Sequence, residues 1–185
     1  MIEAMHIDRA TGLAARTRQV LSPNFNDRPE GLAPELIVVH GISLPPGEYG
    51  GPWIDRMFVG GLPAEAHPYF RDLAGRHLSA HALIRRDGEI VQYVPFHRRA
   101  WHAGHSEYRG RTACNDFSIG IELEGTDEAP YEAAQYESLV KLIRALLETY
   151  PTLSREHIVG HNDIAPGRKT DPGPHFDWAR FRAAL

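Results

Sequence analysis

The stretch "ELIVVH", from Glu35 to His40, is the clearest indication of the fold in this sequence. It is short, continuously apolar and rich in β-branched residues, which predicts a central strand buried on both faces. It ends in His40 and is followed by the Gly- and Pro-rich loop "GISLPPGEYGGPW". Loops that follow buried strands carry a large share of functional residues in α/β proteins. His40 is therefore the first candidate for a functional site.

Three more segments have strand patterns. "SAHALIRRDGEIVQYVP", residues 79–95, predicts a hairpin around Asp87-Gly88. "HIVGH", residues 157–161, predicts a further short strand. "FSIGIELEG", residues 117–125, alternates between two faces, and alternate residues of a strand point the same way. One face of that strand carries Ile119, Ile121 and Leu123, and the other carries Gly120, Glu122 and Glu124.

One helix is clearly predicted, in "YEAAQYESLVKLIRALLETYP", residues 131–151. Lys141 falls outside its apolar stripe, and Pro151 ends the helix. Together these segments predict an α/β fold: a single domain over residues 1–185, with a central mixed β-sheet flanked by α-helices. The stripe, with helical spacing, consists of Tyr136, Leu139, Val140, Ile143, Leu146, Leu147 and Tyr150.

The composition excludes several classes of protein. A chain of 185 residues with 42% hydrophobic and 24% charged residues is ordinary for a soluble globular domain. Its net charge is −4 and its arginines are scattered, so a nucleic-acid surface is not expected. No apolar stretch approaches the roughly 20 residues that a membrane span needs, so no span is expected either. The first residues lack the apolar region of a secretory signal, and the single Cys114 cannot form an internal disulfide. We therefore expect a cytoplasmic protein; nothing in the sequence indicates an oligomeric state.

The segment "VGHNDIAPGRKTDPGPHFDW", residues 159–178, combines turn residues with His161, Lys169 and Asp171. With His40, the histidine and the aspartate form a possible Zn²⁺ ligand set that leaves a fourth position open, as in catalytic zinc sites. From spacing alone, the alternative that His40 and His161 are a strand-end and a turn histidine is equally good.

Lys169 and Glu122 are candidates for catalysis. In extended backbone Lys169 and Asp171 would face one site, where an ammonium could stabilise an oxyanion; the alternative is a surface ion pair. Glu122 projects from the polar face of its strand and could act as general base. Glu124 shares that face and is its competitor, and both could be solvent-facing glutamates.

The segment "RAWHAGHSEYRGR", residues 99–111, places Trp101 and His102 in a polar, Gly-containing stretch. Aromatic side chains cover the apolar side of sugars and peptides, so we assign Trp101 and His102 to substrate binding. His81 in "SAHALI" is a further candidate, with a satisfied strand histidine as the alternative.

At these motifs the sequence resembles the zinc-dependent N-acetylmuramoyl-L-alanine amidases, the group that includes T7 lysozyme and the peptidoglycan recognition proteins. Within it the chain resembles the AmpD-type branch, the 1,6-anhydro-N-acetylmuramoyl-L-alanine amidases. The resemblance runs from about Ser22 to the C-terminus. It depends on "SPNFNDRP", "VVHGISLPPGEYGGPWID", "HPYF", "SAHALIRRDGEIVQYVP", "RAWHAG", "CNDFSIGIELEGTD" and "GHNDIAPGRKTDPGPHFDW".

The resemblance implies zinc on His40, His161 and Asp171, with Glu122 and Lys169 as catalytic residues. It also implies hydrolysis of the amide between anhydro-N-acetylmuramic acid and L-alanine of a soluble muropeptide, in peptidoglycan recycling. The alternatives are a lysin that acts on polymeric peptidoglycan and a muropeptide-binding module without activity. Gly41 stands where AmpD-type sequences usually have asparagine, and arginines expected near His77 and Ala113 are replaced.

Overall fold

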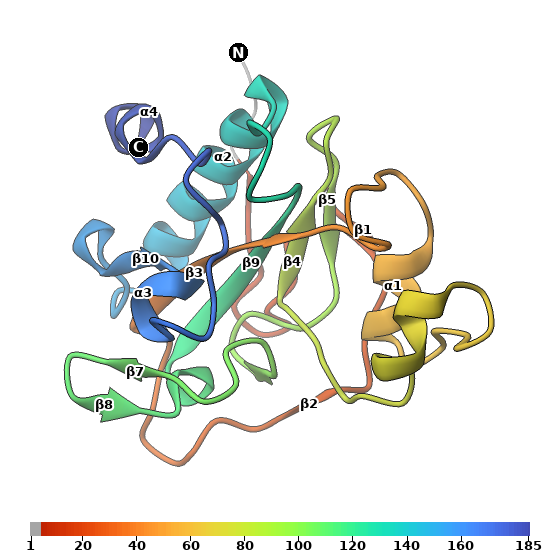
Figure 1. Ribbon diagram of the computed structural model, residues 1–185. Coiled ribbons are helices and arrows are strands. Elements are labelled where there is room, and N and C mark those ends of the chain that lie inside the picture. The colour runs from red at the N-terminus through yellow and green to blue at the C-terminus, as the bar shows by residue number, and fades with distance from the viewer. Residues whose placement is uncertain (1–4) are drawn as a thin grey trace.

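A six-stranded mixed sheet forms the centre of the computed structural model, which describes residues 5–185 (Figure 1). All neighbouring strands are parallel except β4 and β5, which are antiparallel. The predicted α/β class, a mixed sheet flanked by helices, is confirmed. In spatial order the strands are β1 (Arg18–Gln19), β5 (Ile90–Gln92), β4 (Ala82–Ile84), β9 (Ser118–Glu124), β3 (Leu36–Ile42) and β10 (Ile158–Gly160).

The predicted strand that ends in "VVH" is β3, and it lies between β9 and β10. Its residues from Leu36 to His40 are all buried, as the continuous apolar run predicts. The strand continues two residues further than the sequence indicated, because Gly41 and Ile42 pair with Leu123 and Glu124 of β9. In this register His40 is directly beside Glu122.

The predicted hairpin is the pair β4–β5. Asp87 and Gly88 lie in its turn, where Gly88 has a φ of +87°, a left-handed conformation that favours glycine. The segment "HIVGH" is likewise confirmed as a strand: β10 ends at Gly160, and His161 begins the short helix α3 (His161–Ile164).

Helix α2 (Ala133–Thr149) covers one face of the sheet, where Figure 1 shows it lying across the strands. The backbone N–H of Glu132 donates to the side chain of Gln135, which helps to fix the start of the helix. The apolar stripe of α2 packs on Ile37 and Ile119 in one continuous core. Lys141 is exposed, as predicted.

The opposite face of the sheet is covered by two separate apolar clusters. One contains Leu83 of β4 and residues of α1 (Trp53–Phe58), and the other contains Val38 of β3 and Ile164 of α3. Between them the sheet presents polar side chains in place of a hydrophobic layer. The functional site is built in this interval.

Short elements complete the chain. The paired strands β2 (Phe25–Asn26) and β6 (Arg99–Ala100), and β7 (Glu107–Tyr108) and β8 (Arg111–Thr112), lie outside the main sheet. No helix within residues 5–185 has the length and apolarity needed to cross a membrane. The remaining helical segments are η1 (Pro68–Asp72), η2 (Cys114–Asp116), η3 (Arg155–His157) and α4 (Trp178–Ala184).

Candidate active site

The three residues predicted as metal ligands lie together at the end of the central strands. His40 Nδ1 is 3.0 Å from His161 Nδ1 and 3.2 Å from Asp171 Oδ2, and His161 Nδ1 is 3.1 Å from Asp171 Oδ2. His40 is on β3 and His161 begins α3, directly after β10, which is the neighbour of β3. The parallel pairing of β3 and β10 therefore places both histidines at one edge of the sheet.

The triangle formed by these three atoms has the size that a tetrahedral zinc ion requires. Ligands about 2.0–2.1 Å from zinc in tetrahedral geometry lie about 3.4 Å from one another. The observed edges of 3.0–3.2 Å are close to this value. Two imidazoles and one carboxylate are also ligands that zinc prefers, so the donor set fits the ion.

The outer nitrogen of each imidazole has a partner. His161 Nε2 is 3.1 Å from the carbonyl oxygen of Ala103, which can only accept a hydrogen bond, so Nε2 carries the proton. The lone pair of His161 is then on Nδ1, the atom that faces the triangle. His40 Nε2 is 2.9 Å from Nδ1 of His102.

The pKa values of the cluster follow from burial and mutual contact. Burial lowers the pKa of His40 to about 4, against the opposing effect of Asp171. Burial alone would raise the pKa of the Asp171 carboxyl, but the close contacts with His161 and His40 outweigh it and hold that pKa well below its usual range. Neutral imidazoles beside an ionised carboxylate are the forms that bind a metal cation.

Glu122 is buried beside this triangle. Its Oε1 is 4.0 Å from His40 Nδ1, and its Oε2 is buried with no hydrogen-bond partner among the described residues. Burial, with the negative charge of Asp171, raises the pKa of Glu122 well above its usual value, while Lys169 lowers it. An unpartnered buried carboxylate is costly for folding and points to a role in binding or chemistry.

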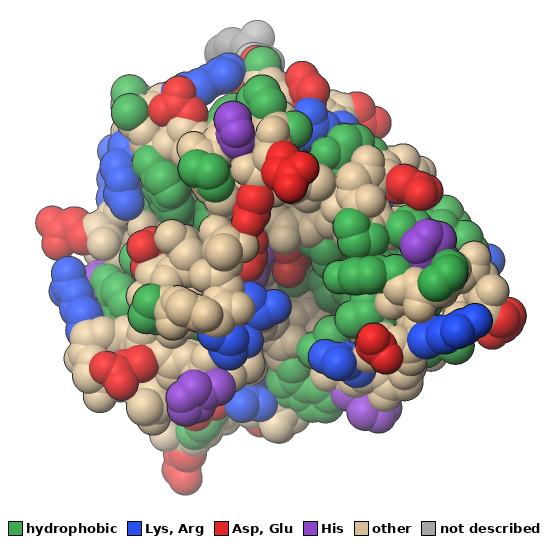
Figure 2. Space-filling view, viewed as in Figure 1, with side chains coloured by type: hydrophobic (Ala, Val, Ile, Leu, Met, Phe, Trp, Pro, Cys, Tyr) green, Lys and Arg blue, Asp and Glu red, His purple; other side chains and the backbone are tan. Residues whose placement is uncertain are grey.

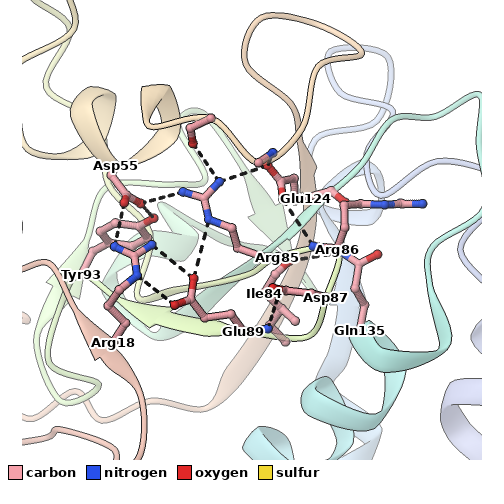
Figure 3. A network of polar contacts seen from close by, with 12 residues as sticks. Arg18, Asp55, Ile84, Arg85, Arg86, Asp87, Glu89, Tyr93, Glu124 and Gln135 are labelled. Atoms are coloured by element: carbon pink, nitrogen blue, oxygen red, sulfur yellow. Dashed lines mark hydrogen bonds and ion pairs between the residues drawn. The ribbon is translucent and has the colours of Figure 1, made fainter.

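Glu124 lies two residues further along β9 and has an entirely different environment, shown in Figure 3. Its Oε1 accepts hydrogen bonds from Arg85 at 3.1 Å and from the backbone of Gly50 at 2.8 Å. Arg85 also binds Asp55 and the carbonyl of Gly51. Glu124 therefore connects the sheet to the loop before α1, and the structure separates the two glutamates that the sequence left as competitors.

Lys169 lies in the loop between α3 and Asp171, with its backbone N–H donating to Ala165. Its positive charge lowers the pKa of both Glu122 and His40, so the ammonium lies within electrostatic range of the cluster. Within residues 5–185 its side chain has no hydrogen bond or ion pair, and the alternative of a Lys–Asp surface pair is not observed.

The residues predicted to bind substrate are placed differently. Trp101 is half-buried, and its indole N–H donates to Asn26 at 3.0 Å. His81 has no exposed surface; its Nδ1 accepts from the backbone of Gly120, and its Nε2 lies 2.9 Å from the carbonyl of Arg98. His81 is thus the satisfied strand histidine of the second interpretation, and this corrects its assignment to substrate.

The two ring nitrogens of His102 also have partners within the protein. Its Nδ1 faces His40, and its Nε2 is 3.1 Å from the hydroxyl of Ser118. The ring lies directly over Gly120, where a Cβ atom would collide with it. Both polar atoms of His102 are occupied within the protein, so its ring nitrogens are not available to a substrate, and its assignment to substrate binding stays a prediction for the partly exposed ring.

Sequence reasoning overlooked Tyr131, which lies under the metal-ligand loop. Its hydroxyl donates to the carbonyl of Pro172 at 2.8 Å, next to Asp171. A Cβ atom at Gly41 would collide with this hydroxyl, so the glycine leaves the space that Tyr131 occupies. Gly125 makes room for the same ring. The two glycines were the available signal, because each follows an ionisable residue, His40 or Glu124, at or near a strand end.

The surface above the cluster is hollowed. Figure 2 shows a hollow near the middle of this face, where acidic and basic side chains meet, with hydrophobic side chains gathered along its wall toward α1. Two clefts open elsewhere on the surface. One, of about 640 Å³, is lined by Glu124, Arg85 and Tyr49, and the other, of about 530 Å³, by Lys169 and Trp178; neither is lined by the residues of the triangle.

Comparison with known proteins agrees with this site. Residues 30–174 match the model of the family described as N-acetylmuramoyl-L-alanine amidase. The 1,6-anhydro-N-acetylmuramyl-L-alanine amidase AmpD of Escherichia coli K12 is 60% identical over 174 residues, 94% of each chain. A selenomethionine AmpD crystal structure superposes with a TM-score of 0.94 at 58% identity, over 98% of this chain and 99% of that one. The crystal structure of AmpDh3 from Pseudomonas aeruginosa in complex with anhydromuramic pentapeptide superposes with a TM-score of 0.61 at 28% identity, over 84% of this chain and 62% of that one.

The match to the family model extends over most of the sheet and includes all three residues of the triangle. With 60% identity to AmpD of Escherichia coli over nearly the whole chain, it shows that this chain belongs to the N-acetylmuramoyl-L-alanine amidase family.

Proposed function

We propose that this protein hydrolyses the amide bond between 1,6-anhydro-N-acetylmuramic acid and the L-alanine of a stem peptide, with Zn²⁺ held by His40, His161 and Asp171. One observation carries the proposal. The Nδ1 atoms of both histidines and Oδ2 of Asp171 form a triangle of zinc-ligand size, and the unpartnered carboxylate of Glu122 lies beside it. A bound metal ion would account for the convergence of these buried polar groups.

The bound zinc would supply a Lewis acid that polarises the amide carbonyl and makes water a better nucleophile. Glu122 is placed to take a proton from the attacking water, since its Oε1 is 4.0 Å from His40 Nδ1. As the C–O bond forms and the C–N bond breaks, the protonated Glu122 delivers that proton to the leaving nitrogen of L-alanine. The raised pKa of Glu122 favours its holding the proton until the leaving nitrogen takes it.

Lys169 stabilises the negative charge that develops on the carbonyl oxygen. Its charge is felt at both Glu122 and His40, so it acts at the place where the amide must lie. It has no ion-pair partner within the described part of the chain, so its ammonium is available to the substrate.

The substrate class follows from the relatives and from the shape of the site. AmpD of Escherichia coli is a 1,6-anhydro-N-acetylmuramyl-L-alanine amidase, and the Pseudomonas aeruginosa relative was solved with anhydromuramic pentapeptide. The cleft lined by Lys169 is the one that includes a proposed catalytic residue, so we place part of the substrate there. We propose that Trp101 and the loop from Pro45 to Trp53 contact the sugar. We place the reaction in the cytoplasm, where soluble wall fragments are recycled.

The rival with the same chemistry is a lysin that acts on polymeric peptidoglycan. The deciding experiment compares kcat/KM on 1,6-anhydro-muropeptides, reducing muropeptides and intact sacculi, with products identified by mass spectrometry. We expect L-alanyl peptide to be released fastest from the anhydro substrate. Equal or better cleavage of sacculi would overturn the recycling role, and no cleavage of any of the three would overturn the enzymatic assignment.

A further inference from the structure

His102 connects a zinc ligand to the centre of the sheet. If Nδ1 of His40 binds the metal, its Nε2 carries the proton and donates to Nδ1 of His102, 2.9 Å away. The proton of His102 is then on Nε2, which lies 3.1 Å from the hydroxyl of Ser118. The contacts thus form a chain with one consistent set of tautomers, from the metal triangle to a residue of β9.

The next residue, Ala103, does the same for the second histidine ligand. Its carbonyl oxygen is 3.1 Å from Nε2 of His161, the proton-bearing nitrogen. One dipeptide, His102-Ala103, therefore contacts the outer nitrogen of both imidazoles that face the metal.

The dipeptide is itself held firmly. The side-chain oxygen of Asn115 accepts hydrogen bonds from the backbone N–H groups of both His102 and Ala103, at 3.1 and 2.8 Å. Arg168 donates to the Ala103 carbonyl at 2.6 Å and to the His105 carbonyl at 2.7 Å. Because the His102 ring lies against Gly120, it cannot shift toward the sheet.

We propose that His102 and the carbonyl of Ala103 are positioning groups that fix the tautomer and orientation of the zinc ligands His40 and His161. The inference rests on the proposed function, because it takes these histidines as ligands. Partners on the outer nitrogen of a ligating histidine increase its basicity and restrict its ring, and their loss costs about 10- to 100-fold in metal affinity.

The test measures the zinc dissociation constant of the purified protein by competition with a chromogenic chelator. His102→Ala removes the acceptor for His40 and should weaken zinc binding by about 10- to 100-fold. His102→Asn retains an acceptor at the position of Nδ1 and should recover most of the affinity. His102→Gln carries its amide one bond further, toward Ser118, and should recover less. His105→Ala, an exposed histidine in the same segment, is the matched control and should leave the affinity unchanged.

A purely structural role for His102 predicts a different result. Each variant would then lower the unfolding midpoint of the metal-free protein, measured in urea, while the zinc affinity of the folded fraction stayed at the wild-type value. Unchanged affinity in His102→Ala, or equal loss in the Asn and Ala variants, overturns the inference. If the wild-type protein binds no zinc, or His40→Ala binds it as tightly, the proposed function itself fails.

Discussion

Two buried glutamates, two residues apart on the same face of one strand, have opposite surroundings. Glu124 is paired with Arg85 and receives backbone hydrogen bonds, so its charge is fully compensated (Figure 3). Glu122 has a buried oxygen with no partner within the described chain and lies beside the triangle formed by His40, His161 and Asp171.

The difference separates a carboxylate that holds the fold together from one that we propose takes part in the chemistry. A paired buried charge is stable but inert, because its lone pairs are already used. An unpaired one costs folding free energy and persists when a ligand or a reaction needs it. The following experiments test this distinction, from the largest expected effect to the smallest.

Removal of the metal should have the largest effect. Dialysis against a chelator should abolish amidase activity, and stoichiometric Zn²⁺ should restore it, since all proposed chemistry depends on the ion. The metal-free protein should also unfold at lower denaturant concentration, because zinc binds only the folded site. Full activity in a protein shown by elemental analysis to contain no metal would contradict the zinc site.

Substitution of Glu122 tests the functional half of the comparison directly. Glu122→Gln keeps the shape, removes the proton acceptor, and should lower kcat by about 10²- to 10⁴-fold with zinc retained. Glu124→Gln is the matched control, expected to change stability more than kcat. Should the two variants exchange these phenotypes, the assignment of the general base is wrong.

Lys169→Ala should lower kcat by about 10²- to 10³-fold, the scale of a lost oxyanion donor. KM should change less, because the interaction strengthens in the transition state. Lys141→Ala, at the chain's other lysine, lies exposed on α2 and serves as the control. A loss confined to KM would reassign Lys169 to substrate binding.

Arg85→Met tests the structural half. It leaves the buried Glu124 carboxylate without its cation and should lower the free energy of unfolding by about 3 kcal/mol, near the low end for a broken buried pair. The double variant Arg85→Met/Glu124→Gln should recover part of this loss, because no buried charge remains. Urea unfolding of the metal-free proteins gives both values; no recovery would mean that Arg85 acts mainly through Asp55.

The pH dependence of stability should report the buried histidine His81. Burial, with the nearby charge of Arg28, lowers its pKa to about 3 in the folded state. The unfolded state, with a histidine pKa near 6.5, binds more protons between these values, so stability falls as the pH decreases from about 6.5 toward 3. His81 should contribute about 1.4 kcal/mol per pH unit in this window. Urea unfolding from pH 7 to 4 should show a smaller slope for His81→Gln; equal slopes would contradict the assignment.

The main elements of the fold were predictable because each carries a local pattern. Each of these patterns lies within one continuous segment of the sequence. They are the apolar run of β3, the alternation of β9, the Asp87-Gly88 turn and the apolar stripe of α2. The strands β1, β2, β6, β7 and β8 have no such pattern, because two residues contain no periodicity. Their pairing depends on tertiary contacts that no local pattern encodes.

The residue types of the candidate site could be predicted from the sequence. Which histidines lie in the triangle and which lie outside it could not. His40 lies near the end of β3, His161 directly follows β10 and Asp171 lies in a turn-rich loop; the parallel pairing of β3 and β10 brings the two histidines together. His81 and His102 occur in equally suggestive motifs, yet His81 has no exposed surface, and the ring nitrogens of His102 face His40 and Ser118. The positions of both rings depend on contacts with Gly120 of β9. These contacts form only in the folded protein and leave no local pattern in the sequence.

The fit between Gly41 and Tyr131 has an evolutionary consequence. The Tyr131 hydroxyl occupies the space that any side chain at position 41 would need, and it holds the carbonyl of Pro172. The effect of a mutation at position 41 therefore depends on the residue at position 131. A larger residue such as asparagine at position 41 requires the tyrosine to move, which predicts epistasis between the two positions. Among related sequences we therefore expect the residues at positions 41 and 131 to vary together.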